Sequence, residues 1–260
     1  MSLTRFFAFA VFLFFFTQCQ REILPNPGIQ AAPNPTGTVV GAFDSSADLN
    51  VVFVGNSLTY VNDLPSLVSQ IAALDGITLQ VTSITKGNYS LEDHWAEGTI
   101  QHTLQSHTYD YLIGQQGPSA LPESQILLRE AAVKIGKECK NYGTRFGLYM
   151  VWPALERDFD RSNSIKSYTD AASASDALLC PAGLAWTYAW QKDPKLPLYG
   201  PDNFHPSLHG SALAAITIYA SIANKKDLDF LVKSGTSWGG SVTETEFDIM
   251  KQAALDAIKK

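Results

Sequence analysis

The sequence predicts an α/β protein in which helices cover both faces of a five-stranded parallel sheet, as a three-layer α/β/α sandwich. Five short apolar runs lie between residues 51 and 181, each about as long as a buried strand. Segments with helical patterning separate these runs, and this alternation is typical of doubly wound sheets. The chain shows no internal repeat that would indicate a solenoid instead.

The first predicted strand, residues 51–54, is an unbroken run of β-branched and aromatic residues that ends at Gly55. Such a run is expected of a strand that is buried on both faces. The other four strands are predicted at residues 79–85, 109–113, 146–151 and 177–181. In sheets of this kind functional residues gather in loops at the carboxyl ends of the strands. The segments that follow these five runs are therefore the places to expect chemistry.

The helices are predicted from apolar periodicity and from residues that start or stop a helix. Asp63 and Pro65 mark the start of a helix that runs to Leu74, where Asp75 and Gly76 stop it. Further helices are predicted at residues 91–106, 123–141, 164–175, 207–223 and 244–258. Trp186 and Trp190 lie four residues apart, so we expect them on one helical face and packed in the core.

Residues 1–18 are predicted to be a signal peptide rather than a part of the fold. Arg5 precedes an unbroken apolar run at residues 6–16, which holds half of the 14 Phe residues of the chain. As a helix this run would cover only about half of a bilayer core, too little for a transmembrane span. A short apolar run after a positive charge indicates export of the protein.

Cys19 and the residues after it predict a tethered domain. Cys19 resembles the lipidated cysteine of bacterial lipoproteins, although Phe16 and Gln18 stand where that pattern prefers Leu and Gly or Ala. Residues 19–48 are rich in proline and are predicted to be a linker before a domain at residues 49–260. We expect a periplasmic or cell-surface protein that meets a membrane only through a lipid on Cys19. The alternative is an ordinary secretory signal that is cleaved nearby.

The composition argues against several classes of function. A net charge of −6, with 19 Lys and Arg against 25 Asp and Glu, is a poor footprint for nucleic acid. The sequence has neither a GxxxxGK[ST] motif nor a GxGxxG motif after a strand. Cys139 and Cys180 lie in no Cys/His cluster, so no metal site is expected. These two cysteines could pair or remain as buried thiols.

Two short motifs provide a nucleophile and a base. Ser57 directly follows the first strand, where a tight turn could expose its hydroxyl, although a serine there is more often a turn former or a helix cap. Asp202 and His205 lie three residues apart in a proline-flanked turn. The carboxylate can then bond one ring nitrogen and leave the other to take a proton from Ser57. His209 is the alternative base.

Together these motifs resemble those of the SGNH/GDSL hydrolase family. The sequence Gly55-Asn56-Ser57 matches the first block of that family, with Asn56 in place of the usual Asp. The turn that contains Asp202 and His205 matches the fifth block. Two weaker matches are Gly87, for the glycine of the second block, and Gly114-Gln115-Gln116, for the Gly-x-Asn of the third. The resemblance covers residues 50–223 and implies the flavodoxin-like fold of the family.

The resemblance implies a serine esterase that needs no metal and no organic cofactor. Ser57 would attack an ester carbonyl, His205 would act as general base and acid, and Asp202 would orient His205. The backbone N–H groups of Ser57 and Gly87 would hold the oxyanion together with the side chain of Gln116. Because Gln116 is one methylene longer than the usual Asn, Gln115 is the alternative donor.

A cell-surface location makes O-acetyl groups on carbohydrate the expected ester substrate, in a small molecule or a polysaccharide. The alternatives are a lipase or thioesterase acting on longer acyl chains, an acyltransferase, and a glycan-binding lipoprotein that uses the same fold without catalysis. Trp152 follows the fourth strand and, with Gln115, is a candidate wall of the substrate site; for Trp152 a place in the core is about as reasonable. Residues 156–161 form a mixed charge run that we expect in a solvated loop.

Overall fold

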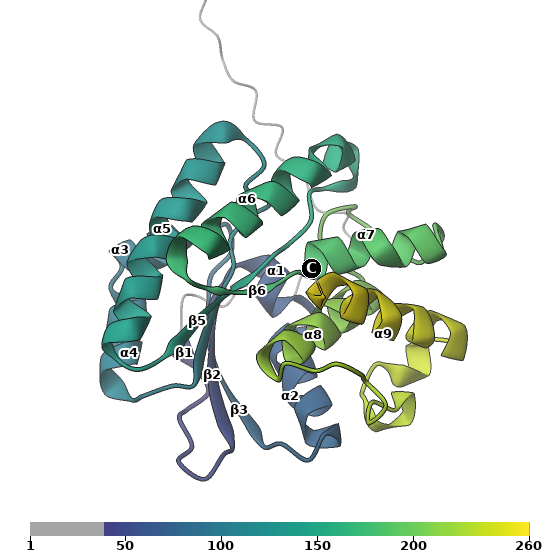
Figure 1. Ribbon diagram of the computed structural model, residues 1–260, viewed down its shortest axis with the longest axis horizontal. Coiled ribbons are helices and arrows are strands. Elements are labelled where there is room, and N and C mark those ends of the chain that lie inside the picture. Colours follow the sequence, from purple (N-terminus) through teal and green to yellow (C-terminus); the bar gives the residue numbers. More distant parts are fainter. Residues whose placement is uncertain (1–38, 260) are drawn as a thin grey trace, which may run out of the picture. The chain divides into compact units, whose positions relative to one another are not determined.

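The computed structural model describes residues 39–259, of which Val39 is described by its backbone alone. The predicted signal peptide and Cys19 lie outside these residues. One sheet with the strand order β1-β3-β2-β4-β5-β6 lies between two layers of helices (Figure 1). The strands are β1 (Val39–Val40), β2 (Leu49–Gly55), β3 (Leu79–Thr85), β4 (Tyr111–Gly114), β5 (Arg145–Tyr149) and β6 (Leu178–Cys180).

The pairing of β2 to β6 confirms the predicted five-stranded parallel sheet. Without β1, the strand order is that of flavodoxin-like sheets, in which the first and third parallel strands lie side by side. The short β1 adds an antiparallel edge to β3. Because β1 falls within the predicted linker, and Phe43 packs on the core, the linker prediction is too long at its end.

The α-helices are α1 (Ser57–Tyr60), α2 (Leu64–Leu74), α3 (Leu91–Ala96), α4 (Thr99–Ser106), α5 (Pro122–Asn141), α6 (Arg161–Ser175), α7 (Ala182–Lys192), α8 (Leu208–Ile222) and α9 (Glu244–Ile258). Short 3-10 helices are η1 (Val61–Asp63), η2 (Leu155–Asp160), η3 (Lys233–Gly235) and η4 (Gly239–Ser241). The helix predicted at 91–106 is in fact two helices, because Gly98 between them adopts a left-handed φ of 75°. None of the helices described here is long and apolar enough to cross a membrane.

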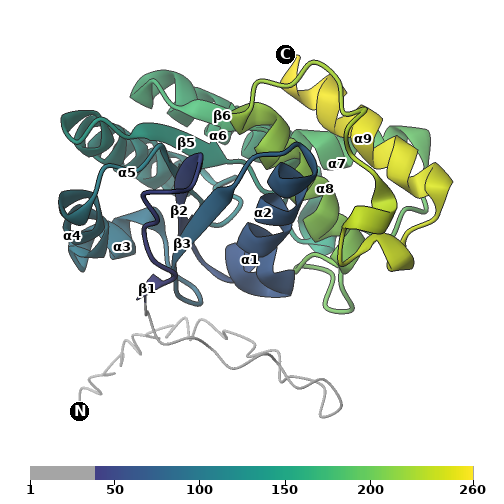
Figure 2. The same ribbon diagram turned by 90° about the horizontal axis from the view of Figure 1, so that it is seen from below.

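The two helical layers meet different faces of the sheet. Helices α3 to α6 pack on one another along one face, and α2, α7, α8 and α9 form the other layer (Figures 1 and 2). Helix α8 is the centre of its layer, since every residue from 210 to 222 is buried. This explains why its sequence is apolar all round rather than on a single stripe.

Aromatic packing joins the sheet to the second layer. Trp152 and Trp186 are both fully buried and stack face to face, with ring centroids 3.4 Å apart. The core place predicted for Trp186 is therefore correct. Trp190 is only partly buried and lies beneath the guanidinium group of Arg161. Trp186 also donates its indole N–H to the carbonyl of Gly210 at 3.3 Å, which ties α7 to α8.

The two cysteines of the domain are separate, buried thiols. Burial raises the pKa of Cys139 and of Cys180 to about 12, with a smaller contribution at Cys139 from the charge of Glu138. Neutral thiols in apolar surroundings react slowly, so both side chains act as small core residues.

Gly210 allows α8 to approach Trp186, and we predict that Gly210→Ala destabilises the domain. A Cβ at this position would press into the carbonyl oxygen of Leu198 and into the ring of Trp186. Overpacking of this kind costs about 1–3 kcal/mol, which urea unfolding monitored by tryptophan fluorescence would measure. Gly240→Ala is the matched control, because an added Cβ there meets open space. Equal stability of the two variants would contradict this account of the packing.

Candidate active site

The turn after β2 presents Ser57 at the carboxyl edge of the sheet. The side chain of Asn56 caps α1 by accepting the N–H of Leu58 at 3.1 Å, and the Asn56 carbonyl accepts the N–H of Thr59 at 2.9 Å. Ser57 is the first residue of α1, so its own N–H has no acceptor within the helix. The turn therefore leaves both the hydroxyl and the N–H of Ser57 available at one place.

Three side chains that are far apart in the sequence form one hydrogen-bonded chain. His205 Nε2 lies 2.8 Å from Ser57 Oγ, and His205 Nδ1 lies 2.5 Å from Asp202 Oδ2. The other carboxylate oxygen, Oδ1, accepts the backbone N–H groups of Phe204 at 3.1 Å and of His205 at 2.9 Å. One oxygen of Asp202 thus shapes the turn while the other holds the imidazole ring.

The environment of Asp202 favours its charged form. Partial burial opposes ionisation, but hydrogen bonds from the His205 ring and from two backbone N–H groups outweigh it and lower the pKa of Asp202. An ionised Asp202 accepts a hydrogen bond from Nδ1–H of His205, and this assigns the tautomer in which Nε2 carries a lone pair. Nε2 can then accept the hydroxyl proton of Ser57, as a general base must.

The loop after β3 brings Gly87 beside the nucleophile turn. Lys86, its neighbour, donates its backbone N–H to the carbonyl of Gly55 at 3.1 Å. On the other side of Gly87, the carbonyl of Tyr89 accepts the amide of Asn56 at 3.0 Å. Neither Gly87 N–H nor Ser57 N–H donates to a group in the described part of the chain. Both are therefore free to meet a developing negative charge.

Gln115 is neither an oxyanion donor nor a substrate wall, which corrects both roles considered for it. It is only 1% exposed. Its Oε1 accepts the N–H of Asn56 at 3.0 Å and the hydroxyl of Thr59 at 2.7 Å. Its Nε2 donates one hydrogen bond to Asn56 Oδ1 at 3.0 Å and another to the carbonyl of Gln116. Every hydrogen-bonding position of this side chain is used to support the nucleophile turn.

Gln116 is anchored on the opposite side of the loop. Its Oε1 accepts the N–H of Leu91 at 3.2 Å, and its Nε2 donates to Ser119 Oγ at 2.8 Å. Only the second amide proton has no acceptor among residues 39–259. The role predicted for Gln116 as third oxyanion donor therefore depends on that proton and stays a prediction.

Trp152 does not form a substrate wall, because it is fully buried beneath the turn that carries the base. Its indole N–H donates to the carbonyl of Phe204 at 3.2 Å. Next to it, the hydroxyl of Tyr199 donates to the carbonyl of Pro153 at 2.6 Å. The segment after β5 thus supports the Asp202–His205 turn from below. The long-range partners that bury Trp152 leave no signal in the local sequence.

Two other histidines have structural roles. His209, the alternative base, lies 3.7 Å from Glu246 of α9, so its ring is held by that helix. His94 of α3 is buried, and its Nε2 lies 2.9 Å from the carbonyl of Gly55. Burial lowers the pKa of His94, although the bond to Gly55 opposes this shift. A neutral His94 therefore holds the end of β2, a contact that the sequence did not indicate.

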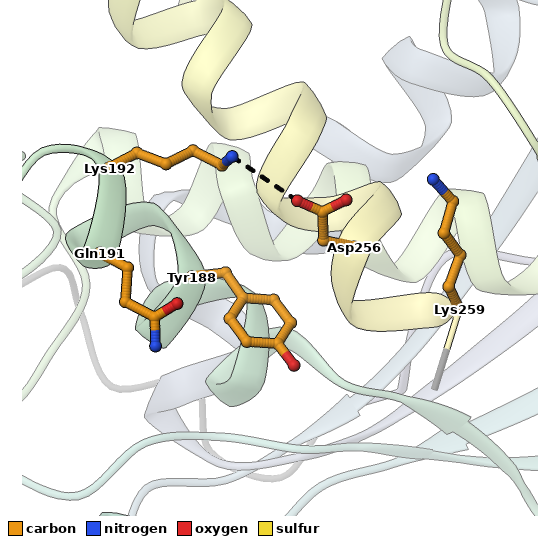
Figure 3. A pocket seen from close by; sticks show the side chains of 5 residues that line it. All are labelled: Tyr188, Gln191, Lys192, Asp256 and Lys259. Atoms are coloured by element: carbon orange, nitrogen blue, oxygen red, sulfur yellow. Dashed lines mark ion pairs between the residues drawn. The ribbon is translucent and has the colours of Figure 1, made fainter.

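Two surface hollows lie away from these residues. One, of about 410 Å³, is lined by Tyr188, Gln191, Lys192, Asp256 and Lys259, with Lys192 and Asp256 3.7 Å apart (Figure 3). The other, of about 540 Å³, lies at the amino ends of β2, β4 and β5, opposite the turn of Ser57. In the described chain no group of three or more His, Cys, Asp or Glu side chains could hold a metal ion.

Comparison with known proteins identifies the fold. No protein-family model matches the chain, and no curated protein matches its sequence. Among solved structures, a DUF4886 family protein from Bacteroides uniformis has a TM-score of 0.66 and 18% identity, covering 81% of this chain and 95% of its own. A candidate SGNH hydrolase from Slackia heliotrinireducens has a TM-score of 0.58 and 22% identity, with coverages of 67% and 98%.

A catalytic mutant of an acetylxylan esterase from Geobacillus stearothermophilus is also similar, with a TM-score of 0.51 and 16% identity over 68% of this chain and 94% of its own. At these identities the likeness establishes the architecture alone. The chain has the SGNH hydrolase fold, which confirms the fold expected from its motifs.

The contacts of Asn56 predict that Asn56→Asp destabilises the protein, even though the Gly-Asp-Ser motif that residues 55–57 resemble has Asp there. A carboxylate keeps the acceptor oxygens but cannot donate to the carbonyl of Tyr89, and Asn56 is only 8% exposed. An unsatisfied buried group costs about 1–3 kcal/mol, measurable by urea unfolding. The control is Asn88→Asp, in the exposed loop after β3, which should change stability by less than about 0.5 kcal/mol. A stable Asn56→Asp variant would refute this role of the amide.

Proposed function

We propose that this protein is a serine esterase of the SGNH type that hydrolyses ester bonds. The observation that carries the proposal is the hydrogen-bonded chain from Ser57 through His205 to Asp202, beside two unengaged backbone N–H groups. A nucleophile, a base, a group that orients the base and an oxyanion site are the parts that acyl transfer requires. They lie at the carboxyl edge of the sheet, where active sites of open α/β sheets are found.

In the proposed reaction, Ser57 Oγ attacks the ester carbonyl carbon while its proton passes to His205 Nε2. The carbonyl π electrons move to oxygen, and the N–H groups of Ser57 and Gly87 stabilise the oxyanion. When the tetrahedral intermediate collapses, the bond to the alcohol breaks and the imidazolium donates its proton to the leaving alkoxide. Water then attacks the acyl-enzyme while its proton passes to His205 Nε2. Collapse of this second intermediate breaks the bond between the acyl carbon and Ser57 Oγ, the imidazolium returns its proton to Oγ, and the acid is released.

Asp202 contributes by stabilising the imidazolium that forms in each half of the reaction. Its carboxylate lies against Nδ1 and stays ionised because two backbone N–H groups and the ring bond to it. A charge held in place before the reaction costs no reorganisation when the positive charge develops on His205. This mechanism needs neither a metal nor an organic cofactor.

For the substrate we propose O-acetyl groups on carbohydrate. Polar groups border the turn of His205, since Asn203 donates its amide to Glu156 at 3.2 Å, and sugar hydroxyls can bond to such groups. Among solved structures with the same fold are two mutants of one Geobacillus enzyme, described as an acetyl-xylooligosaccharide esterase and as an acetylxylan esterase. Export of the protein to the periplasm or cell surface, with a lipid on Cys19, would bring it to such polymers, but residues 1–38 lie outside the described structure.

One observation favours longer acyl chains as the second candidate substrate. Leu155 donates its N–H to the carbonyl of Asn203 at 2.8 Å, so η2 adjoins the turn between Asp202 and His205. On η2, Leu155 is 46% exposed and Phe159 is 74% exposed. An apolar rim of this kind could receive an acyl chain.

The central prediction concerns Ser57. Ser57→Ala should abolish labelling by a serine-reactive fluorophosphonate and lower turnover of an aryl acetate by about 10⁴-fold or more. Ser173→Ala, in the exposed part of α6, is the matched control and should react as the wild type does. Intact-mass spectrometry and initial rates provide the two measurements. Wild-type protein that takes no label and turns over no ester would instead favour a glycan-binding protein.

The substrate prediction is tested by chain length and by polymer. We expect kcat/KM for aryl acetate to exceed that for aryl octanoate by about tenfold or more, and acetate to be released from acetylated xylan. A preference for octanoate would contradict the carbohydrate proposal and favour a lipase or thioesterase. Products formed with and without an acceptor sugar distinguish hydrolysis from acyl transfer.

A further inference from the structure

We propose that Asn62 is a positioning residue that holds the His205 turn at hydrogen-bonding distance from Ser57. This inference rests on the function proposed above. Asn62 lies in η1, directly after the helix α1 that begins with Ser57. Nothing in its sequence context predicts a role in the site.

The side-chain amide of Asn62 joins the nucleophile segment to the base segment. Its Nδ2 donates one hydrogen bond to the carbonyl of Pro206 at 3.1 Å and a second to Ser211 Oγ at 2.9 Å. Pro206 directly follows His205, and Ser211 is a buried residue of α8. One amide group therefore fixes the backbone next to His205 against the chain that follows Ser57.

The backbone conformation of Asn62 is unusual in a way that serves these contacts. Asn62 and Asp63 both adopt left-handed conformations, with φ values of 56° and 50°. Such conformations are costly for residues other than glycine, though least so for Asn and Asp, and they persist where the surrounding structure requires them. The side chain of Asp63 has no hydrogen-bonding or charged partner in the described chain, whereas that of Asn62 has two. The left-handed turn thus directs Asn62 at the His205 turn.

The topology explains why such a link is needed. Ser57 follows β2, whereas the turn of Asp202 and His205 lies between α7 and α8 and belongs to no strand. No ladder of sheet hydrogen bonds can therefore set the distance between Ser57 and His205. Asp202 and His205 hold each other within their own turn. The contact between the two halves depends on links such as those of Asn62.

Loss of the amide should affect activation of Ser57 more than substrate binding. A misplacement of about 1 Å in a reacting pair can lower a rate about 10²-fold. We expect Asn62→Asp and Asn62→Gly to lower kcat for an aryl acetate by about 10–100-fold, with KM within about twofold of the wild type. The Asp variant keeps the shape but has no proton to donate, and glycine accepts the left-handed backbone without strain. Fluorophosphonate labelling of Ser57 should slow in parallel.

Asp63→Gly is the matched control, because it alters the same left-handed turn without removing a cross-link. It should keep kcat, KM and the labelling rate within about twofold of the wild type. Ser211→Ala, which removes one of the two acceptors, should give a smaller loss of kcat than the Asn62 variants. Circular dichroism melts should show all four variants folded, since Asn62 and Asp63 are exposed and Ser211→Ala removes a single oxygen.

A crystal structure of Asn62→Gly tests the inference without any assay. We expect the Ser57 Oγ to His205 Nε2 separation to exceed about 3.5 Å, or the His205 turn to be disordered, with the Asp202–His205 pair intact. An unchanged separation in an ordered turn would overturn the positioning role, as would folded Asn62 variants that react like the wild type. Failure of the wild type itself to label or turn over esters would count against the proposed function, while the crystallographic distance would still decide the role of Asn62.

Discussion

The geometry of the site depends on one buried amide, that of Gln115. It lies where β4 ends, beneath the turn that follows β2, and bonds to Asn56, Thr59 and the carbonyl of Gln116. Gly55 has no side chain at the point where Gln115 approaches, and a Cβ there would collide with it. Each donor and acceptor of the Gln115 amide has a partner, so only one arrangement of the turn satisfies all of these hydrogen bonds. That arrangement presents Ser57.

The base half of the site has a separate support. The Asp202 carboxylate closes its own turn, and the stacked pair of Trp152 and Trp186 lies below it, with the Trp152 indole bonded to Phe204. The site therefore consists of two preorganised halves that meet at the bond between Ser57 and His205. Each turn is rigid by itself, but the distance between Ser57 and His205 must also be set. The few contacts that join the nucleophile turn to the base turn therefore matter for the geometry of the site.

Elements with strong local signals were predictable to within a few residues. Strand β3 and helix α9 have the predicted bounds, because both have local signals. The strand is a segment rich in β-branched residues between turn residues, and the helix has an apolar period after a Thr–Glu capping box. Helix 91–106 was predicted as one element because its periodicity continues across Gly98, whose left-handed conformation the pattern does not record. The edge strand β1 was missed because two residues carry no periodicity.

The sequence by itself determined the fold class, because the alternation of strand and helix patterns is local. It also determined the candidate residues Ser57, Asp202 and His205, because each of their motifs is local and the two motifs together are specific. Only the tertiary structure decided which neighbours face the site. Trp152 and Gln115 were candidates for substrate contact but are buried, His209 is held by Glu246, and Asn62 was not a candidate at all. Burial and side-chain direction depend on partners more than fifty residues away for Trp152 and Gln115, and on still more distant partners for Asn62. No local pattern in the chain encodes those contacts.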